Sequence, residues 1–403
     1  MKSVAALSPL LLCLLAGTAQ ADLEPYSFGA SETVHHDSNV LRDAGSGTAS
    51  DWFSITEFNA ALDQAIGRDE LKATASFDVN RYRKLHDRNS EGYSANAEFD
   101  WSTVGDISGA FGANSQRHQY LYGFDGDQPS GLKNLQTDNH AFARAQLGGI
   151  GRWSIFTGFD VSQRRYSDPT FDSDEEQQWA INGGTSYQTS PDLSFGIQGR
   201  YVQGKYPNVI LAGSAQAFTL RTISLTTKWK ASGNSSFDAN IGYSQQHTDA
   251  QPAENFASGG LNWVWAPPSH FNVKLSLSRD SSIGSGVDGA VVNANSSTGR
   301  SINNTVNLDV TYELTAKINL DAGAQYIERK YSDALSVTSA TGFASGATRA
   351  SRFSMSAHYV PTRTTDLSCG YTRERLSSDQ SIALVSPAYT NNGVMCTAAI
   401  HFD

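Results

Sequence analysis

Apolar and polar residues alternate along most of this chain with a period of two. In residues 70–84 (ELKATASFDVNRYRK), the odd-numbered positions from Leu71 to Val79 are apolar and the positions between them are polar. Side chains of a β-strand point alternately to opposite faces, so this pattern predicts strands with one apolar and one polar face. Eighteen such strands are expected, at residues 24–36, 52–66, 70–84, 92–104, 107–118, 140–147, 153–165, 177–188, 193–205, 216–231, 236–247, 253–266, 270–280, 299–314, 317–332, 346–360, 365–375 and 392–402.

The connections between these strands alternate in length. Short turns, such as 67–69 and 105–106, alternate with mostly longer polar loops, such as 119–139 and 206–215. Each of the eleven prolines falls in the first residues, at a strand start or in a connection, where no ladder hydrogen bond is lost. We therefore predict an all-β fold, a transmembrane antiparallel up-and-down β-barrel of about 18 strands, with short periplasmic turns and long extracellular loops.

Aromatic residues on the apolar faces support this prediction. A group of them lies close to the short turns, where it would form a girdle at the periplasmic interface: Trp101, Trp153, Tyr187, Trp229, Trp263, Trp265, Tyr359 and Phe402. Trp52 and Trp179 lie at the opposite ends of their strands and predict a thinner outer girdle. We expect the apolar faces to contact outer-membrane lipid.

The first residues, MKSVAALSPLLLCLLAGTAQA, combine a basic start, an apolar run and a small-x-small site at Ala19-Gln20-Ala21. They predict a cleavable signal peptide at 1–21, export, and a single outer-membrane barrel domain at 22–403 in a Gram-negative envelope. The excess of acidic residues, 40 against 30 basic ones, argues against a nucleic-acid partner. Cys369 and Cys396 fall on consecutive expected strands, and we favour two buried thiols over a bridge.

A barrel of this size is too wide for its own side chains to fill, so we expect a water-filled lumen, which loop 119–139 could enter. Charges of both signs on the polar faces argue against a strong ion selector and suit a nearly neutral or mildly acidic polymer, or small polar solutes. The expected pore-lining residues are Lys72, Asp78, Asn80, Tyr82, Glu98, Asp100, Arg144, Asp160, Arg164, Arg200, Lys228, Asp238, Lys274, Asp309, Asp321, Arg352 and Asp366.

Signals for catalysis, cofactors or metals are weak. The segment GSGVDG at 284–289 is not followed by a helix, and His35 and His36 would point to opposite faces of a strand. The acidic run 172–176 favours an ordinary acidic loop over a calcium site. We expect no enzyme, no cofactor and no metal centre.

The run ETVHHDSNVLRDAGSGTASDWFS (32–54) resembles the exopolysaccharide-operon outer-membrane barrels, an EpsL-like family of the β-barrel porin superfamily. In that family a strand ends in an Asp-x-Asn-x-x-Arg element and a Ser-Asp begins the second strand, which here correspond to Asp37, Asn39, Arg42, Ser50 and Asp51. The run YSANAEFDWSTVGDISG (93–109) looks like the family's fourth and fifth strands, and the C-terminus departs by ending one residue after Phe402. The resemblance implies a role in exporting or assembling an extracellular polysaccharide, with periplasmic export machinery as a further partner.

Three functions remain open: a polysaccharide conduit, a general or solute-specific diffusion porin, and a structural or adhesive barrel that acts through its outer loops. A glycan path should show aromatic platforms, for which Tyr82, Phe142 and Phe156 carry the inward parity, whereas a small-solute porin should show an eyelet of opposed charges. For the motif loop we favour a structural role, with an Asx turn at Asp37 and an Arg42–Asp51 ion pair, over contact with a glycan.

Overall fold

A computed structural model of the chain describes residues 25–44, 48–120, 133–148, 151–211, 213–249, 251–281, 301–335, 343–380 and 388–402. The expected signal peptide, the GSGVDG segment and most of loop 119–139 lie outside these residues. Within the described part of the chain, no helix is both long enough and apolar enough to cross a membrane.

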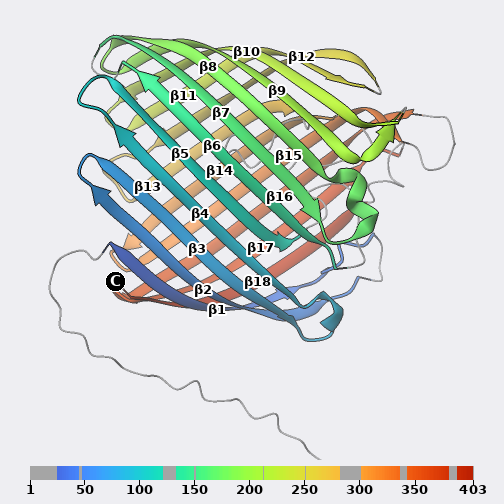
Figure 1. The fold of residues 1–403 in the computed structure, drawn as a ribbon. Helices are drawn as coiled ribbons and strands as arrows, with labels where there is room; N and C mark the ends of the chain where they lie inside the picture. Colours follow the sequence, from blue (N-terminus) through green and yellow to red (C-terminus); the bar gives the residue numbers. More distant parts are fainter. Residues whose placement is uncertain are drawn as a thin grey trace, which may run out of the picture.

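The eighteen strands form one closed antiparallel sheet, which confirms the predicted barrel (Figure 1). Each strand pairs with the next along the chain, and β1 closes the ring against β18, with Phe28 opposite Phe402 and Asp37 opposite Gly393. Two short 3₁₀ helices, η1(His86–Arg88) and η2(Pro169–Asp174), lie in connections at the end of the barrel away from the short turns. The strands are β1(Tyr26–Asp37), β2(Asp51–Ile66), β3(Asp69–Tyr82), β4(Ser90–Ser102), β5(Ile107–Gln119), β6(Leu135–Leu147), β7(Trp153–Tyr166), β8(Glu176–Ser190), β9(Leu193–Leu211), β10(Ser214–Ser232), β11(Ser235–Thr248), β12(Gln251–Trp265), β13(Phe271–Ser281), β14(Ser301–Thr315), β15(Ile318–Leu335), β16(Phe343–Thr362), β17(Thr365–Ser378) and β18(Tyr389–Phe402).

Large apolar side chains cover the outside of the barrel. Ile223, Leu225 and Ile241 are 56%, 60% and 69% exposed, values that a water-soluble protein would rarely leave on a continuous surface. Glu32 interrupts this band, and its carboxylate accepts a hydrogen bond from Thr56 Oγ1 of the neighbouring strand at 2.5 Å. A closed ladder with an apolar exterior satisfies every condition for crossing a bilayer, so the protein is a membrane-spanning barrel of the outer-membrane type.

The structure differs from the expected connections most at residues 206–215. Instead of a long loop, β9 continues to Leu211 and β10 begins at Ser214, directly after Gly213 with its φ of 87°. Pro207 therefore lies inside a strand, contrary to the prediction for the prolines. It is tolerated because β8 pairs with β9 only as far as Lys205, and because the register between β9 and β10 shifts next to Tyr206.

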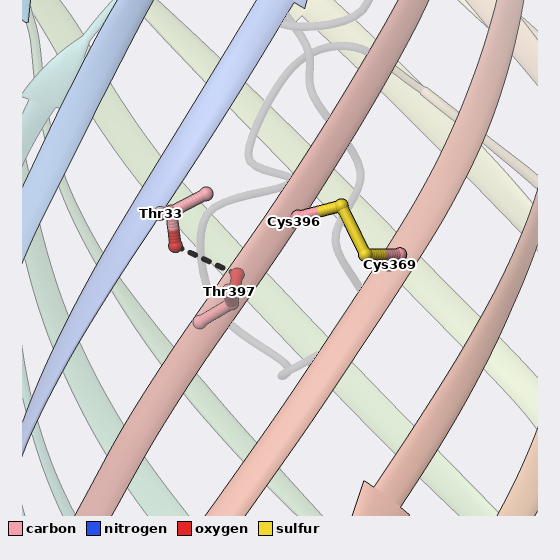
Figure 2. Close-up of a disulfide and its surroundings, with 4 residues drawn as sticks. All are labelled: Thr33, Cys369, Cys396 and Thr397. Atoms are coloured by element: carbon pink, nitrogen blue, oxygen red, sulfur yellow. Dashed lines mark hydrogen bonds between the residues drawn. A yellow bond between two sulfur atoms is a disulfide. The ribbon is translucent and has the colours of Figure 1, made fainter.

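The expectation of two buried thiols is wrong. Cys369 of β17 and Cys396 of β18 are direct cross-strand partners with Cα atoms 4.1 Å apart, and their sulfur atoms are bonded (Figure 2). Both side chains are exposed, because they share the outward parity of Leu367 and Val394 on the same two strands. The disulfide therefore lies on the apolar outer face of the barrel, and proximity on consecutive strands was a better guide than cysteine burial.

Candidate functional site

The exposed apolar side chains fix which face of each strand points outward, and the polar parity points into the lumen. For example, Asp309 stands between the outward-facing Leu308 and Val310 on β14. Contact between any of the inner residues and a passing solute stays a prediction. The seventeen residues expected to line the pore all lie on the inner parity: Lys72, Asp78, Asn80, Tyr82, Glu98, Asp100, Arg144, Asp160, Arg164, Arg200, Lys228, Asp238, Lys274, Asp309, Asp321, Arg352 and Asp366.

Several of the inner charges are neutralised by carboxylates on the same wall. Arg352 Nη2 lies 2.8 Å from Glu374 Oε1, and Arg164 Nε lies 2.7 Å from Asp138 Oδ1. Lys72 Nζ lies 2.6 Å from Glu70 Oε2. Such pairing leaves little net charge at these points of the wall, as expected for a lumen without strong ion selection.

The inner wall of β9–β16 contains a polar groove with a volume of ≈ 840 Å³. Four charged residues with the inner parity also border it: Arg200, Asp280, Asp309 and Arg352. Amide and hydroxyl groups can both donate and accept hydrogen bonds, so the groove can bind a neutral polar solute. Its uncharged polar residues are Gln198, Thr222, Ser224, Asn240, Ser258, Asn262, Ser276, Ser278, Thr305, Asn307, Gln325 and Ser354.

Phe142 and Phe156 lie against glycines of the neighbouring strands. Gly112 is the cross-strand partner of Phe142 and Gly184 that of Phe156. A Cβ atom on either glycine would come within 2.9 Å of the adjacent phenyl ring, so only glycine lets the rings approach the wall this closely. Both rings are partly exposed, and the Arg144 guanidinium lies 4.6 Å from the Phe142 ring centre.

Tyr82, the third expected platform, belongs to the wall itself. It is 8% exposed and stacks on Phe53, with ring centres 4.6 Å apart. Phe53 in turn lies 4.6 Å from His35, so the three rings form a row across the inner faces of β1, β2 and β3. The row stiffens the outer end of the barrel and leaves little of Tyr82 for a solute.

An apolar cluster on the inner faces of β8, β9, β10 and β12 was not expected from the sequence. The partly buried Tyr206 and Ile302 pack against this cluster. The available signal was the segment QAFTL, in which Phe218 and Leu220 break the polar parity of β10. The cluster consists of Ala180, Val202, Phe218, Leu220 and Phe256.

The end of β13 lies close to this cluster because the β12–β13 seam is short. The ladder joins only Gly259–Trp265 to Val273–Arg279, although β12 begins at Gln251. Beyond the seam, the hydroxyl of Ser281 donates a hydrogen bond to Gln246 Oε1 on the inner face of β11. The outer end of β13 stays paired with β14 as far as Ser281 and Ile302, and it contacts the inner face of β11 where it no longer pairs with β12.

The motif loop is held by a buried network rather than by the expected ion pair. Arg42 Nη1 donates to Asp37 Oδ2 at 2.8 Å, and Arg42 Nη2 lies 3.1 Å from Glu374 Oε2. Burial disfavours the charge, but the carboxylates of Glu374 and Asp37 outweigh it and raise the pKa of Arg42 above its ordinary value. The predicted Arg42–Asp51 pair is wrong, because Glu374 of β17 is brought to Arg42 by the closure of the ring.

Asp51 and Asn39 have other roles in this region. The Asp51 carboxylate accepts the backbone N–H groups of Lys84 and Leu85, each at 2.9 Å, and so holds the connection after β3. The expected turn at Asp37 is built by Asn39, whose side chain accepts the Asp43 N–H at 3.0 Å and donates to the Asp43 carbonyl at 2.9 Å. The four motif residues are buried and use their polar groups within the chain, which favours a structural role.

The aromatic residues predicted to form a girdle at the periplasmic interface lie on the outward parity near the short turns. Trp153 contacts Tyr187 with ring centres 4.8 Å apart, and Phe237 lies between Trp229 and Trp263 at 5.5 and 6.1 Å. At the other end of the barrel, Trp52 and Trp179 are 47% and 37% exposed. The remaining girdle residues, at the short-turn ends of their strands, are Trp101, Trp265, Tyr359 and Phe402.

The two adjacent histidines do point to opposite faces. His35 stacks on the inner Phe53, whereas His36 contacts the outer Trp52 at 4.8 Å. Among the described residues, no three His, Cys, Asp or Glu side chains gather as metal ligands would.

No protein-family model matches the sequence, and no curated protein sequence matches it. Among solved structures, it resembles OpdK of Pseudomonas aeruginosa with vanillate, at 12% identity and a TM-score of 0.48, over 94% of this chain and 99% of that one. OccAB3 of Acinetobacter baumannii matches at 10% identity and a TM-score of 0.46, over 94% and 98%. The FrpB iron transporter of Neisseria meningitidis matches at 11% and 0.47, over 87% of this chain and 62% of that one, so this chain spans less than two thirds of that transporter. At these identities the similarity concerns the fold alone.

Proposed function

We propose that the barrel is a non-catalytic outer-membrane conduit, through which an uncharged or weakly charged extracellular polysaccharide passes. The observation that carries this proposal is the groove on the inner wall, whose lining is dominated by amide and hydroxyl groups. Sugar hydroxyls both donate and accept hydrogen bonds, and the side chains of Asn, Gln, Ser and Thr do the same. The paired charges elsewhere on the wall add little attraction for small ions.

The two phenyl rings that pack against glycines support a polymer, rather than a small solute, as the molecule that passes through the barrel. Phe142 lies opposite Asp160 on β7, and Phe156 lies four residues further along that strand, a separation of about 13 Å along the strand. The apolar face of a sugar ring can pack on a phenyl ring. A chain of several sugars can reach both rings at once, whereas one sugar cannot.

The resemblance of the first hairpin to exopolysaccharide-operon barrels also supports this proposal. It suggests that periplasmic export machinery delivers the polymer to the short-turn mouth of the barrel. A solute-specific diffusion porin is the second candidate, because Arg200, Asp309 and Arg352 bring charges of both signs to the same groove. An adhesive role would depend on the outer loops, much of which lie outside the described residues.

Single-channel recording in a planar lipid bilayer tests the conduit. We expect a steady ion current through the purified barrel, with transient blocks when a neutral polysaccharide is added to one side. Asn240→Ala/Asn307→Ala removes two amides from the groove and should shorten the blocks several-fold. Asn96→Ala/Asn114→Ala, on the inner parity of β4 and β5, should leave them unchanged. Absence of current would contradict both conduit and porin, and equal blocks in the two variants would remove the groove from the path.

Deletion of the gene tests the direction and the cargo. We expect the amount of polysaccharide released from the cells to fall and to recover when the wild-type gene is restored. Unchanged polymer would contradict polysaccharide export and leave the diffusion porin as the better function.

A further inference from the structure

Arginine and lysine side chains on the outside of the barrel are confined to one end. Every such residue on the outward parity of the described strands lies toward the long-loop end, among them Arg117 of β5, Arg165 of β7 and Arg221 of β10. The outward positions next to the short turns carry aromatic and aliphatic residues instead. The protein as a whole has a net charge of −10, so a basic outer belt is a local feature and not a consequence of composition.

The densest part of this belt lies on β16 and β17. Arg373 and Arg375 are exposed and stand two residues apart on β17, which is about 7 Å along a strand. Arg375 pairs with Ser351 of β16, and Arg349 stands two residues further along that strand. On the short-turn side of Ser351 and Arg373, the next outward residues are Phe353 and Tyr371, 44% and 39% exposed, so the three guanidinium groups lie near the end of the apolar band.

Arg373 and Arg375 differ from the inner Arg164 and Arg352 in their partners. The inner Arg164 and Arg352 each have a carboxylate within 3 Å. In the described part of the chain, Arg373 and Arg375 make no ion pair, and Arg349 shares the carboxylates of Asp379 and Glu328 at 3.0 and 3.5 Å. Arg373 and Arg375 therefore leave positive charge at the outer edge of the apolar band.

We propose that Arg349, Arg373 and Arg375 form a binding site for the phosphate groups of the outer-leaflet glycolipid. A guanidinium group offers two parallel N–H donors to phosphate, and adjacent arginines can hold one phosphate between them. Lipid headgroups begin where the apolar band ends, which is the level of these three residues. The site binds lipid from outside the barrel and is independent of what passes through the lumen.

Native mass spectrometry of the purified barrel in detergent, with diphosphorylated lipid A added, tests this site. We expect wild-type barrel to retain the lipid and Arg373→Gln/Arg375→Gln to bind it about 25-fold more weakly, because each basic residue near an anionic headgroup contributes a factor of about five. The matched control is Arg68→Gln/Arg363→Gln, which removes two exposed arginines from the short-turn side and should bind like wild type.

The lipid itself supplies the second comparison. Lipid A stripped of both phosphates should be retained no better by wild type than by the Arg373→Gln/Arg375→Gln variant, and millimolar inorganic phosphate should not displace the intact lipid. Equal retention of intact lipid A by wild type and the variant would overturn the site. Full retention of the dephosphorylated lipid would overturn its phosphate chemistry, and displacement by inorganic phosphate would overturn its assignment to lipid. Single-channel current should be the same in wild type and variant, which separates this test from that of the conduit.

Discussion

Arg42 connects two strands that lie near opposite ends of the sequence. It lies in the left-handed region at φ 56°, is 6% exposed, and joins Asp37 of β1 to Glu374 of β17 across the closure of the ring. The bonds to both carboxylates help to offset the cost of this left-handed backbone. The residue therefore stabilises the place where the first and last strands meet.

Replacing Arg42 by alanine should lower the free energy of unfolding by about 3–5 kcal/mol, because the buried Asp37 would lose its arginine and the buried Glu374 would keep only Arg352. Urea unfolding in detergent, followed by tryptophan fluorescence, measures the loss. Arg81→Ala is the control, since Arg81 and its partner Glu91 have side chains 50% and 61% exposed and their pair should contribute less than about 1 kcal/mol. Similar losses in the two variants would contradict the importance given to burial.

The sequence could indicate that Asp37, Asn39 and Arg42 serve the structure, but it could not supply their partners. The sequence suggested Asp51 as the partner of Arg42, but in the structure Glu374 and Asn391 complete the network. Those residues come from the opposite end of the chain, and only the closed ring brings them together. Local spacing therefore predicted the role of this site and missed its chemistry.

At the scale of strands and hairpins, period-two alternation was sufficient to locate all eighteen elements within a few residues at most ends. The alternation did not predict the strand ends around Pro207, where the hairpin of β9 and β10 extends beyond the end of its pairing with β8. In that outer part β9 pairs with β10 alone, so a residue without an N–H is accepted. The alternation shows which face of the sheet each side chain takes, but it does not show how far a strand continues beyond the membrane.

The disulfide belongs to the last hairpin and should stabilise it. Cys369→Ser/Cys396→Ser opens a loop with a sequence separation of 27 residues, and chain entropy gives an expected loss of about 3.5 kcal/mol. The temperature at which the folded band disappears on a semi-native gel should fall accordingly.

Thr33→Ala/Thr397→Ala is the matched control for the disulfide. It removes a 2.7 Å hydroxyl hydrogen bond between β1 and β18 on the opposite face of the same wall, worth about 1 kcal/mol (Figure 2). A cysteine variant as stable as wild type would show that the closed ladder makes the covalent bond redundant.

For the whole molecule, the two ends of the barrel differ in the length of most connections, in their aromatic residues and in their outer charge. This asymmetry predicts that the short turns face the periplasm and that η1 and η2 face the outside. Labelling of intact cells with a membrane-impermeant maleimide checks the orientation. Asp87→Cys in η1 should react at once, and Arg68→Cys in the β2–β3 turn only after the outer membrane is opened.

The bridge between Cys369 and Cys396 leaves no other thiol after the expected signal cleavage, so the background of this experiment is low. Labelling of Arg68→Cys in intact cells, with Asp87→Cys unreactive, would reverse the orientation. It would also place the basic belt of β16 and β17 next to the inner leaflet.

The sequence predicted the barrel as a whole but not the contents of its lumen. Alternation distinguishes outside from inside along each strand, and the strand count sets the size of the ring. The inner cluster around Phe218 and Phe256, and the contact of Ser281 on β13 with Gln246 on β11, join strands that are not consecutive along the chain. Such contacts leave only a local break in parity, which alone does not show what it packs against.

The pairing of Phe28 with Phe402 has a consequence for how the chain may be cut and joined. Both ends of the ladder come together at the same mouth, so the polypeptide is a ring opened at one arbitrary point. A short linker between the two ends, with new ends placed in the Ser232–Ser235 turn, would preserve every strand pair in the ring. Circular permutation would make the β1–β18 pair a local hairpin and the β10–β11 pair the distant one, so the closing seam of the ring moves while the finished barrel stays the same.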